Sequence, residues 1–182
     1  GCVIAEDVTA PWPLPVFDAA AVDGYAVLAS DIASASPDSP IQLNVIGEID
    51  AGQRPTKGLY SGAAVRVAAG ALLPENTEAV IAREHTESDD VTVTVLQSAV
   101  VGQSVRRKGE DVAAGEVVVN AGAKVDARIL GLLAAVGRQS VVARPRPRVV
   151  VISIGSELQE AGAVVEPGRV PDSNGVMLAA AV

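Results

Sequence analysis

The fold of this chain is organised around one stretch, Pro15-Val16-Phe17-Asp18-Ala19-Ala20-Ala21-Val22-Asp23-Gly24-Tyr25-Ala26. It holds the only Phe and one of the two Tyr of a chain in which aromatic residues make up 2%. Asp23-Gly24 predicts a sharp turn, because glycine reaches a positive φ without steric cost. An apolar strand is expected to begin at Tyr25. Asp23 therefore lies at a bend, either as a corner residue whose carboxylate accepts backbone N–H groups or as a functional carboxylate.

The composition is that of a globular protein. The chain has 182 residues, which corresponds to one or two domains, and 49% of them are apolar while 20% are charged. These values argue against disorder. The net charge is −8, and this argues against a nucleic-acid partner, because phosphate binding needs a basic face.

Cysteine content and hydropathy bear on the compartment. Cys2 is the only cysteine, so no internal disulfide can form, and we expect a reducing, cytoplasmic setting. No run of about eighteen apolar residues is present, so we expect no membrane span, and no signal peptide is recognisable. The chain starts without an initiator Met and ends on Ala179-Ala180-Ala181-Val182. We interpret both ends as limits of a piece rather than natural termini.

Short apolar segments recur at a spacing of roughly ten residues in the first half of the chain, separated by Gly- and Pro-rich turns. This pattern predicts an antiparallel barrel or sandwich. The polar stretch 29–40 predicts an exposed loop. The strands are expected at residues 41–46, 63–67, 79–82 and 91–95.

The pattern changes after residue 104. Residues 115–119 predict a strand, and residues 126–136 predict a helix that Asp126 caps and Gly137 ends. The alternating Arg144-Pro145-Arg146-Pro147-Arg148 predicts a stiff, extended linker.

Beyond this linker, the continuous apolar run of residues 149–154 predicts a buried parallel strand. Gly155-Ser156-Glu157-Leu158 follows at its C-terminal end, where open α/β sheets place ligand sites. A loop then leads to a helix from Gly175, with Asp172 or Ser173 as its N-cap. The segment therefore predicts the first β-loop-α unit of an α/β domain.

Four motifs occur in an order and with gaps that match one enzyme family. Residues 17–26 resemble its F-D-x-S-A-M-D-G-Y-A signature, and Arg106-Arg107-Lys108-Gly109-Glu110-Asp111 resembles its R-x-x-G-E-D loop. Ile154-Gly155-Ser156-Glu157-Leu158 and Val170-Pro171-Asp172-Ser173-Asn174 are similar to its S-T-G-D-E-L and I-Y-D-S-N motifs. This is the family of molybdopterin molybdenumtransferases, which includes the gephyrin E domain. The resemblance covers essentially the whole chain.

The resemblance implies a mixed α+β, multidomain and elongated fold. Residues 1–13 and 105–146 would form a discontinuous dimerisation domain, and residues 14–104 would form an inserted, β-rich, barrel-like domain. Residues 147–182 would be the truncated start of the α/β molybdopterin-binding domain. In the family the site lies between the subunits of a homodimer, so the first two motifs of one chain are expected to face the pterin domain of the other.

The resemblance also implies a reaction, the insertion of molybdate into adenylylated molybdopterin with release of AMP, assisted by Mg²⁺. Both substrates are anions, so backbone N–H groups, cations and a metal must offset their repulsion. The implied catalytic residues are Asp23, Glu110, Asp111 and Glu157. The implied cofactor-binding residues are Gly155, Ser156, Asp172, Ser173 and Asn174, and the implied metal ligands are Glu157 and Asp172.

Four positions depart from the family's pattern, and each change removes or weakens a polar group near the expected cleft. They are Ala20 for Ser, Ala69 for Thr, Ser156 for Asp and Pro171 for Tyr. A hydroxyl does not replace a carboxylate at comparable strength as a metal ligand or charge partner. An alternative therefore stays open: a gephyrin-like dimeric scaffold with weakened chemistry, which binds a partner-protein peptide and links it to cytoskeletal or membrane machinery.

Overall fold

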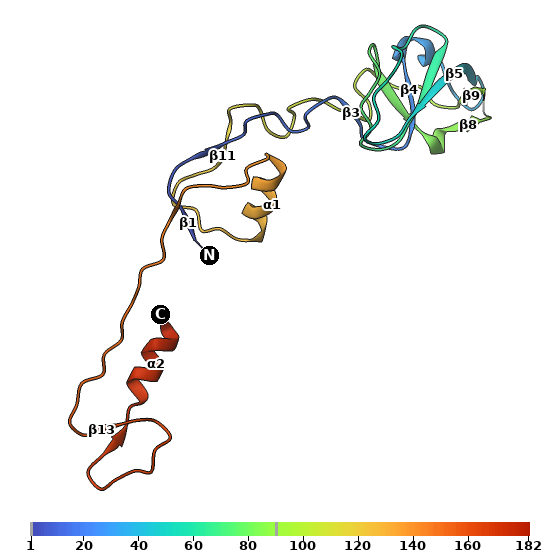
Figure 1. Cartoon of the computed structure of the whole chain (residues 1–182). Coiled ribbons are helices and arrows are strands. Elements are labelled where there is room, and N and C mark those ends of the chain that lie inside the picture. Colours follow the sequence, from blue (N-terminus) through green and yellow to red (C-terminus); the bar gives the residue numbers. More distant parts are fainter. Residues whose placement is uncertain (1, 90) are drawn as a thin grey trace.

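The computed structural model describes residues 2–89 and 91–182 and shows an elongated chain with three parts (Figure 1). A β-sheet built from residues 24–95 lies at one end, and helix α1 (Ala127–Ala135) lies in the middle. Helix α2 (Ser173–Ala181) lies at the other end, beyond a long stretch without helix or strand.

The sheet has six strands in the order β7-β4-β6-β5-β9-β8. They are β4 (Gly24–Val27), β5 (Ile41–Ile49), β6 (Ala63–Val67), β7 (Ala79–Ala82), β8 (Thr86–Ser88) and β9 (Thr92–Val95). The four strands expected between residues 41 and 95 are thus confirmed. The expected antiparallel order holds except for β5 and β6, which run parallel, because the long connection of residues 50–62 allows the crossover that a parallel pair needs.

Each face of the sheet carries a buried apolar cluster, and side chains of the central strands point alternately into the two clusters. In β4, Tyr25 and Val27 pack into one apolar cluster, whereas Ala26 packs into the other. The first cluster includes Leu43 and the second includes Val65. Burial of each such large aliphatic side chain contributes about 1.5–3 kcal/mol relative to an exposed one. The sheet is therefore the main stabilising unit of the chain.

The prediction of an exposed loop at residues 29–40 is wrong for residues 29–32. Residues 29–32 form a short 3-10 helix, η1 (Ala29–Ile32), and the side chain of Ile32 is fully buried. Glu78 Oε2 accepts the Ala29 N–H at 2.8 Å, and Asp31 Oδ2 accepts the Gly62 N–H at 2.7 Å. Carboxylates thus hold the backbone while the apolar residues of the stretch turn inward. A second short 3-10 helix, η2 (Arg83–His85), follows β7.

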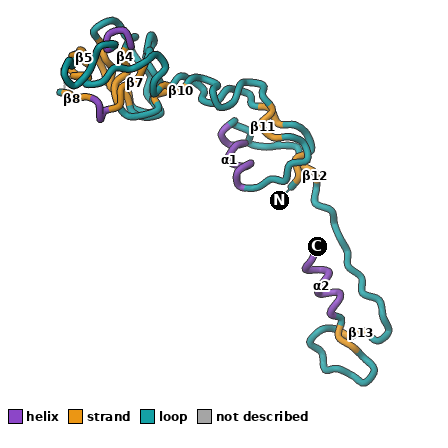
Figure 2. Tube along the Cα trace, turned by 180° about the vertical axis from the view of Figure 1, so that it is seen from behind, coloured by secondary structure: helices purple, strands orange, loops and turns teal. Residues whose placement is uncertain are grey.

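Three antiparallel two-stranded ladders join segments that are far apart in the sequence. They are β1 (Val3–Ile4) with β12 (Ala143–Arg144), β2 (Val8–Thr9) with β11 (Val117–Val119), and β3 (Ala19–Ala20) with β10 (Val105–Arg106). The chain therefore runs out to the sheet and returns beside its own outgoing path, as Figure 2 shows around β10 and β11. The exact domain limits stay a prediction.

Helix α1 forms as its sequence predicts. Asp126 Oδ1 accepts the Ile129 N–H at 2.9 Å as the N-cap, and Gly137 follows the helix with a φ of +71°. Leu133 packs into a small core with Ile4 and neighbouring apolar residues. This core joins α1 to the ladders beside it.

The prediction of a buried parallel strand at residues 149–154 is wrong. No strand is assigned there, and the side chains of Val150, Ile152 and Ile154 are 80%, 74% and 89% exposed. A strand forms only by pairing, and within residues 2–89 and 91–182 this run pairs with no other strand. The parallel pair of this region is β13 (Leu158–Gln159) with β14 (Val170–Pro171).

The chain is mostly β with two α-helices, which confirms the mixed α+β class. Neither helix within residues 2–89 and 91–182 is long and apolar enough to cross a bilayer.

Candidate functional site

The residues expected to form the site lie in three places. Asp23 immediately precedes β4, whereas Glu110 and Asp111 lie in the loop after β10. Glu157 and Asp172 belong to the segment that contains β13, β14 and α2. Within a single chain, α2 lies at the opposite end from β3 and β4 (Figure 1). Convergence of all these groups across a two-fold pair of chains stays a prediction.

Asp23 acts as a corner residue. Its Oδ1 accepts the Ala69 N–H at 2.7 Å, and its carbonyl oxygen accepts the Arg83 N–H at 3.1 Å. The corner interpretation is thus confirmed, but its expected cause is wrong, because Gly24 has no positive φ. A Cβ on Gly24 would lie 1.9 Å from the carbonyl oxygen of Ile81, so close backbone approach requires the glycine.

Asp23 also lines a small pocket of about 160 Å³ that contains charges of both signs. Arg66 and Arg83 face it together with Glu48 and Asp50. The Arg66 guanidinium lies 5.7 Å from the centre of the Tyr25 ring and donates to the Tyr25 hydroxyl at 3.1 Å. Arg66 also pairs with Glu48 at 3.8 Å.

The two arginines of this pocket were missed by sequence reasoning. The signal for Arg66 was its place at the start of Arg66-Val67-Ala68-Ala69-Gly70-Ala71, a segment that differs from the family's pattern at Ala69. Nothing in the local sequence distinguishes Arg83, because only the pairing of β4 with β7 brings it beside Asp23.

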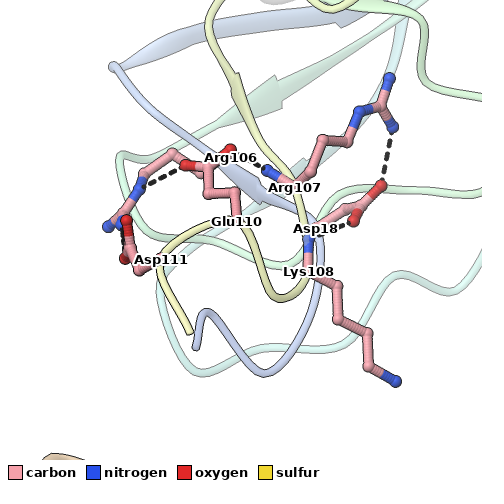
Figure 3. Close-up of polar contacts among 6 residues, drawn as sticks. All are labelled: Asp18, Arg106, Arg107, Lys108, Glu110 and Asp111. Atoms are coloured by element: carbon pink, nitrogen blue, oxygen red, sulfur yellow. Dashed lines mark hydrogen bonds and ion pairs between the residues drawn. The ribbon is translucent and has the colours of Figure 1, made fainter. Parts of the chain in front are cut away.

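The loop after β10 is a compact charged turn (Figure 3). Arg106 pairs with Glu110 through Nε at 3.2 Å and also pairs with Asp111. These two carboxylates raise the pKa of Arg106, chiefly through the hydrogen bond to Glu110. The loop backbone is anchored by Leu14, whose carbonyl oxygen accepts the Asp111 N–H at 3.0 Å. Glu110 and Asp111 are therefore brought together, and Arg106 balances their charge.

A further carboxylate, Asp18, binds the same loop and was not among the expected site residues. Its Oδ2 pairs with Arg107 Nη1 at 2.7 Å, and its Oδ1 accepts the Lys108 N–H at 2.8 Å. The Lys108 hydrogen bond lowers the pKa of Asp18 most, and Arg107 lowers it further, while partial burial opposes both. A partner that lies 89 residues away leaves no local signal in the sequence.

The third group of expected residues surrounds the start of α2. Asp172 caps this helix by accepting the Gly175 N–H at 2.8 Å, which confirms the capping prediction. This bond, and a second from the Ser153 hydroxyl, lower the pKa of Asp172. The Glu157 carboxylate lies against Gly155, where an added Cβ would be 2.6 Å from Oε1.

The neighbouring residues expected to bind the cofactor have backbone roles. The Ser156 carbonyl oxygen accepts the Arg169 guanidinium at 2.5 Å. Ser173 and Asn174 form the first turn of α2. The glycines at 155 and 175 leave room for the carboxylates of Glu157 and Asp172. The segment thus orders its polar groups without any apolar core beneath α2.

The residues of this segment do not form a complete magnesium site. Among residues 2–89 and 91–182, no group of three or more His, Cys, Asp or Glu side chains is placed to hold a metal. The carboxylate of Asp172 already serves as a helix cap. Magnesium usually takes only one or two protein carboxylates plus substrate phosphates, so ligation by Glu157 and Asp172 stays a prediction.

Comparisons with known proteins agree on one family. A family model described as MoeA N-terminal region (domain I and II) matches residues 1–137. The chain is 44% identical to molybdopterin molybdenumtransferase 2 of Mycobacterium tuberculosis, over 100% of the chain and 45% of that protein. It is 33% identical to the molybdopterin molybdenumtransferase of Staphylococcus epidermidis, over 99% of the chain and 43% of that protein.

A solved structure gives the same result for the fold. The molybdopterin biosynthesis MoeA protein of Pyrococcus horikoshii superposes with a TM-score of 0.94 at 35% identity, over 100% of the chain and 48% of that protein. The chain therefore spans less than half the length of the relatives that it matches.

Proposed function

Because the chain belongs to the molybdopterin molybdenumtransferase family, we propose that it forms part of an enzyme of molybdenum cofactor biosynthesis. The proposed reaction inserts molybdate into adenylylated molybdopterin and releases AMP. The observation that carries the proposal is the match of residues 1–137 to the family's N-terminal region. The charged loop and the Asp23 corner lie within this matched part.

The proposed substrates call for cationic groups, and both places hold arginines. Molybdate and a phosphorylated pterin repel each other, so a productive site needs cations and N–H donors that are already oriented. In the loop after β10, Arg106 and Arg107 are held by carboxylates, while the Lys108 side chain extends away from the ion pairs (Figure 3). We assign the Lys108 ammonium to attraction of the anionic substrates. Asp23, Glu110 and Asp111 are assigned to proton transfer and to orientation of the reacting groups.

The remaining parts of the site are proposed from the family. The segment around Glu157 and Asp172 is assigned to the pterin, and a second copy of the chain is proposed to bring it opposite Asp23 and Asp111. Magnesium, when bound, would offset phosphate charge. Glu157 and Asp172 would hold it, and the described residues do not complete its ligand set.

The scaffold alternative is not favoured. Two relatives whose alignments cover 100% and 99% of the chain are both named molybdopterin molybdenumtransferases. The presence of Ala69 in place of the family's usual Thr also leaves one contact intact, because the backbone N–H of Ala69, not a side chain, donates to Asp23.

The test is AMP release by a chimera in which these 182 residues replace the matching 45% of the M. tuberculosis relative. Release of AMP from adenylylated molybdopterin that depends on molybdate supports the proposal. The proposal is contradicted if the chimera folds but forms no cofactor while the unaltered M. tuberculosis relative is active in the same assay. Ala69→Thr with Ser156→Asp restores the family's usual residues, and a gain in rate would show that these departures weaken the chemistry.

A further inference from the structure

We propose that Asp18 is a positioning residue, whose carboxylate holds the loop of residues 106–111, and with it Glu110 and Asp111, against the sheet. The inference deepens the proposed function, because two of the expected catalytic carboxylates lie in this loop. The contact between Asp18 and the loop does not depend on that function, and the experiments below separate the two.

Asp18 is itself fixed on the side of the sheet. Its carbonyl oxygen accepts the Leu73 N–H at 3.0 Å. Two residues later, the Ala20 N–H donates to Ala71 at 3.0 Å and the Ala20 carbonyl oxygen accepts from Gly70 at 2.8 Å. Leu73 and Ala71 belong to the buried apolar cluster of the sheet. The backbone of Asp18 is therefore tied to a rigid part of the molecule before its side chain makes any contact.

The side chain then binds two different groups of the loop with two different oxygens. Oδ2 takes the Arg107 guanidinium at 2.7 Å and Oδ1 takes the Lys108 N–H at 2.8 Å (Figure 3). Hydrogen bonds in which the donor or the acceptor is ionised are shorter and stronger than neutral ones. Because one contact is to a side chain and the other to the backbone, together they fix both the position and the orientation of this turn.

From Arg107 the constraint passes directly to the carboxylates. The Arg107 N–H donates to Glu110 Oε2 at 2.8 Å, and the Glu110 N–H donates to the Arg107 carbonyl oxygen at 3.1 Å. Arg106 then links Glu110 to Asp111. The loop is also attached through Leu14 and Pro15, whose carbonyl oxygens accept from Asp111 and Gly109, and through the pairing of Arg106 with Ala19 in the β3–β10 ladder. Without Asp18, the loop would keep these backbone attachments and lose its contacts at Arg107 and Lys108.

Limited proteolysis of the whole chain tests the contact. Trypsin cleaves after Arg107 and Lys108, and cleavage requires the loop to open. We expect Asp18→Asn to speed cleavage at these bonds about fivefold, since cleavage follows the population of the open form. Cleavage after Lys57, in the loop of residues 52–58, should not change. Asp38→Asn, which alters an exposed aspartate of the same part of the chain, should cleave like the parent.

A merely structural role gives a different result. If Asp18→Asn destabilises the whole protein, cleavage should become faster at both loops to the same degree. If the contact of Asp18 does not hold the loop, cleavage after Arg107 and Lys108 should be as slow as in the parent. Either outcome overturns the proposal. Asp18→Glu keeps the charge on a longer arm, and partial recovery of protection is expected.

The AMP-release assay tests the consequence for the reaction. If Asp18 acts through Glu110, Asp18→Asn alone should lower the kcat of the chimera about tenfold. In a chimera that already carries Glu110→Gln, the same substitution should lower kcat no further. Independent, multiplicative losses would refute action through Glu110. If no variant and no parent chimera releases AMP, the proposed function fails, and the proteolysis result alone decides whether Asp18 holds the loop.

Discussion

The backbone of Gly24 lies directly against the carbonyl oxygen of Ile81, where a Cβ on Gly24 would be 1.9 Å from that oxygen. The contact arises where Gly24 of β4 pairs with Ala82 of β7. It joins the turn that carries Asp23 to the edge of the sheet. The glycine is therefore required for space between two strands, not for an unusual φ.

Replacement of Gly24 should for this reason destabilise the sheet. We expect Gly24→Ala to lower the free energy of unfolding by about 1–3 kcal/mol, because a backbone oxygen cannot move aside as a side chain does. Urea unfolding followed by circular dichroism measures this. Gly47→Ala in β5 is the matched control, since no atom lies within 4 Å of its added Cβ. Equal stability of the two variants would show that the close approach is absent.

A second prediction concerns two glycines in and after α1. Replacement of one by alanine should lower the stability of the protein, and replacement of the other should raise it. A Cβ on Gly137 would lie 2.0 Å from Trp12 Cζ2, and its φ is +71°. Gly137→Ala should therefore cost about 1–3 kcal/mol and shift the fluorescence of Trp12, the only Trp. Gly131→Ala, inside α1 with open space around it, should instead gain about 0.5–1 kcal/mol. Unchanged stability of Gly137→Ala would contradict this account of Gly137.

Asp23 allows its corner role to be separated from a catalytic one. Asp23→Asn retains the oxygen that accepts the Ala69 N–H, so the free energy of unfolding should change by less than about 0.5 kcal/mol. Asp23→Ala removes the acceptor and should cost about 1 kcal/mol. If the carboxylate also takes part in the reaction, Asp23→Asn should slow AMP release about a hundredfold while the protein remains folded. A fully active Asp23→Asn would leave only the corner role.

The pKa of Asp18 predicts a pH dependence. Because the folded protein lowers this pKa, ionised Asp18 contributes stability above the ordinary aspartate value of about 4, and the contribution is lost as the pH falls through the lower folded value. Its side chain is 40% exposed, so the contribution should be below about 1 kcal/mol. The difference in unfolding free energy between the parent and Asp18→Asn, measured at pH 6 and pH 3, should be smaller at pH 3. A difference that is the same at both pH values would contradict ionisation as its source.

The N-cap of α1 predicts a graded series. Asp126→Ala removes the acceptor for the Ile129 N–H and should cost about 1 kcal/mol, which corresponds to a fall in Tm of about 2–4 °C. Asp126→Asn keeps a good capping group and should lose much less. Differential scanning calorimetry compares the three proteins. Equal Tm values for the parent and the Asp126→Ala variant would show that the cap contributes nothing.

Local patterns were enough for the elements that have a periodic or capping signature in the sequence. The sequence by itself determined the four strands between residues 41 and 95, helix α1 with its Asp126 cap, and an N-cap for α2 at Asp172 or Ser173. It also determined the family, through motifs whose order and spacing are specific. The alternation of apolar side chains, the capping hydrogen bonds between residues a few positions apart and the order of the motifs can all be read along the chain.

Only the tertiary structure decided which distant groups meet. It placed Asp18 on a loop 89 residues away, buried Ile32 within a polar stretch and left residues 149–154 without a partner strand. It also showed that Gly24 is required by Ile81 and not by a turn. The physical reason is the same in each case: pairing and burial depend on a partner from another part of the chain, and the chemistry of a residue does not specify where that partner lies.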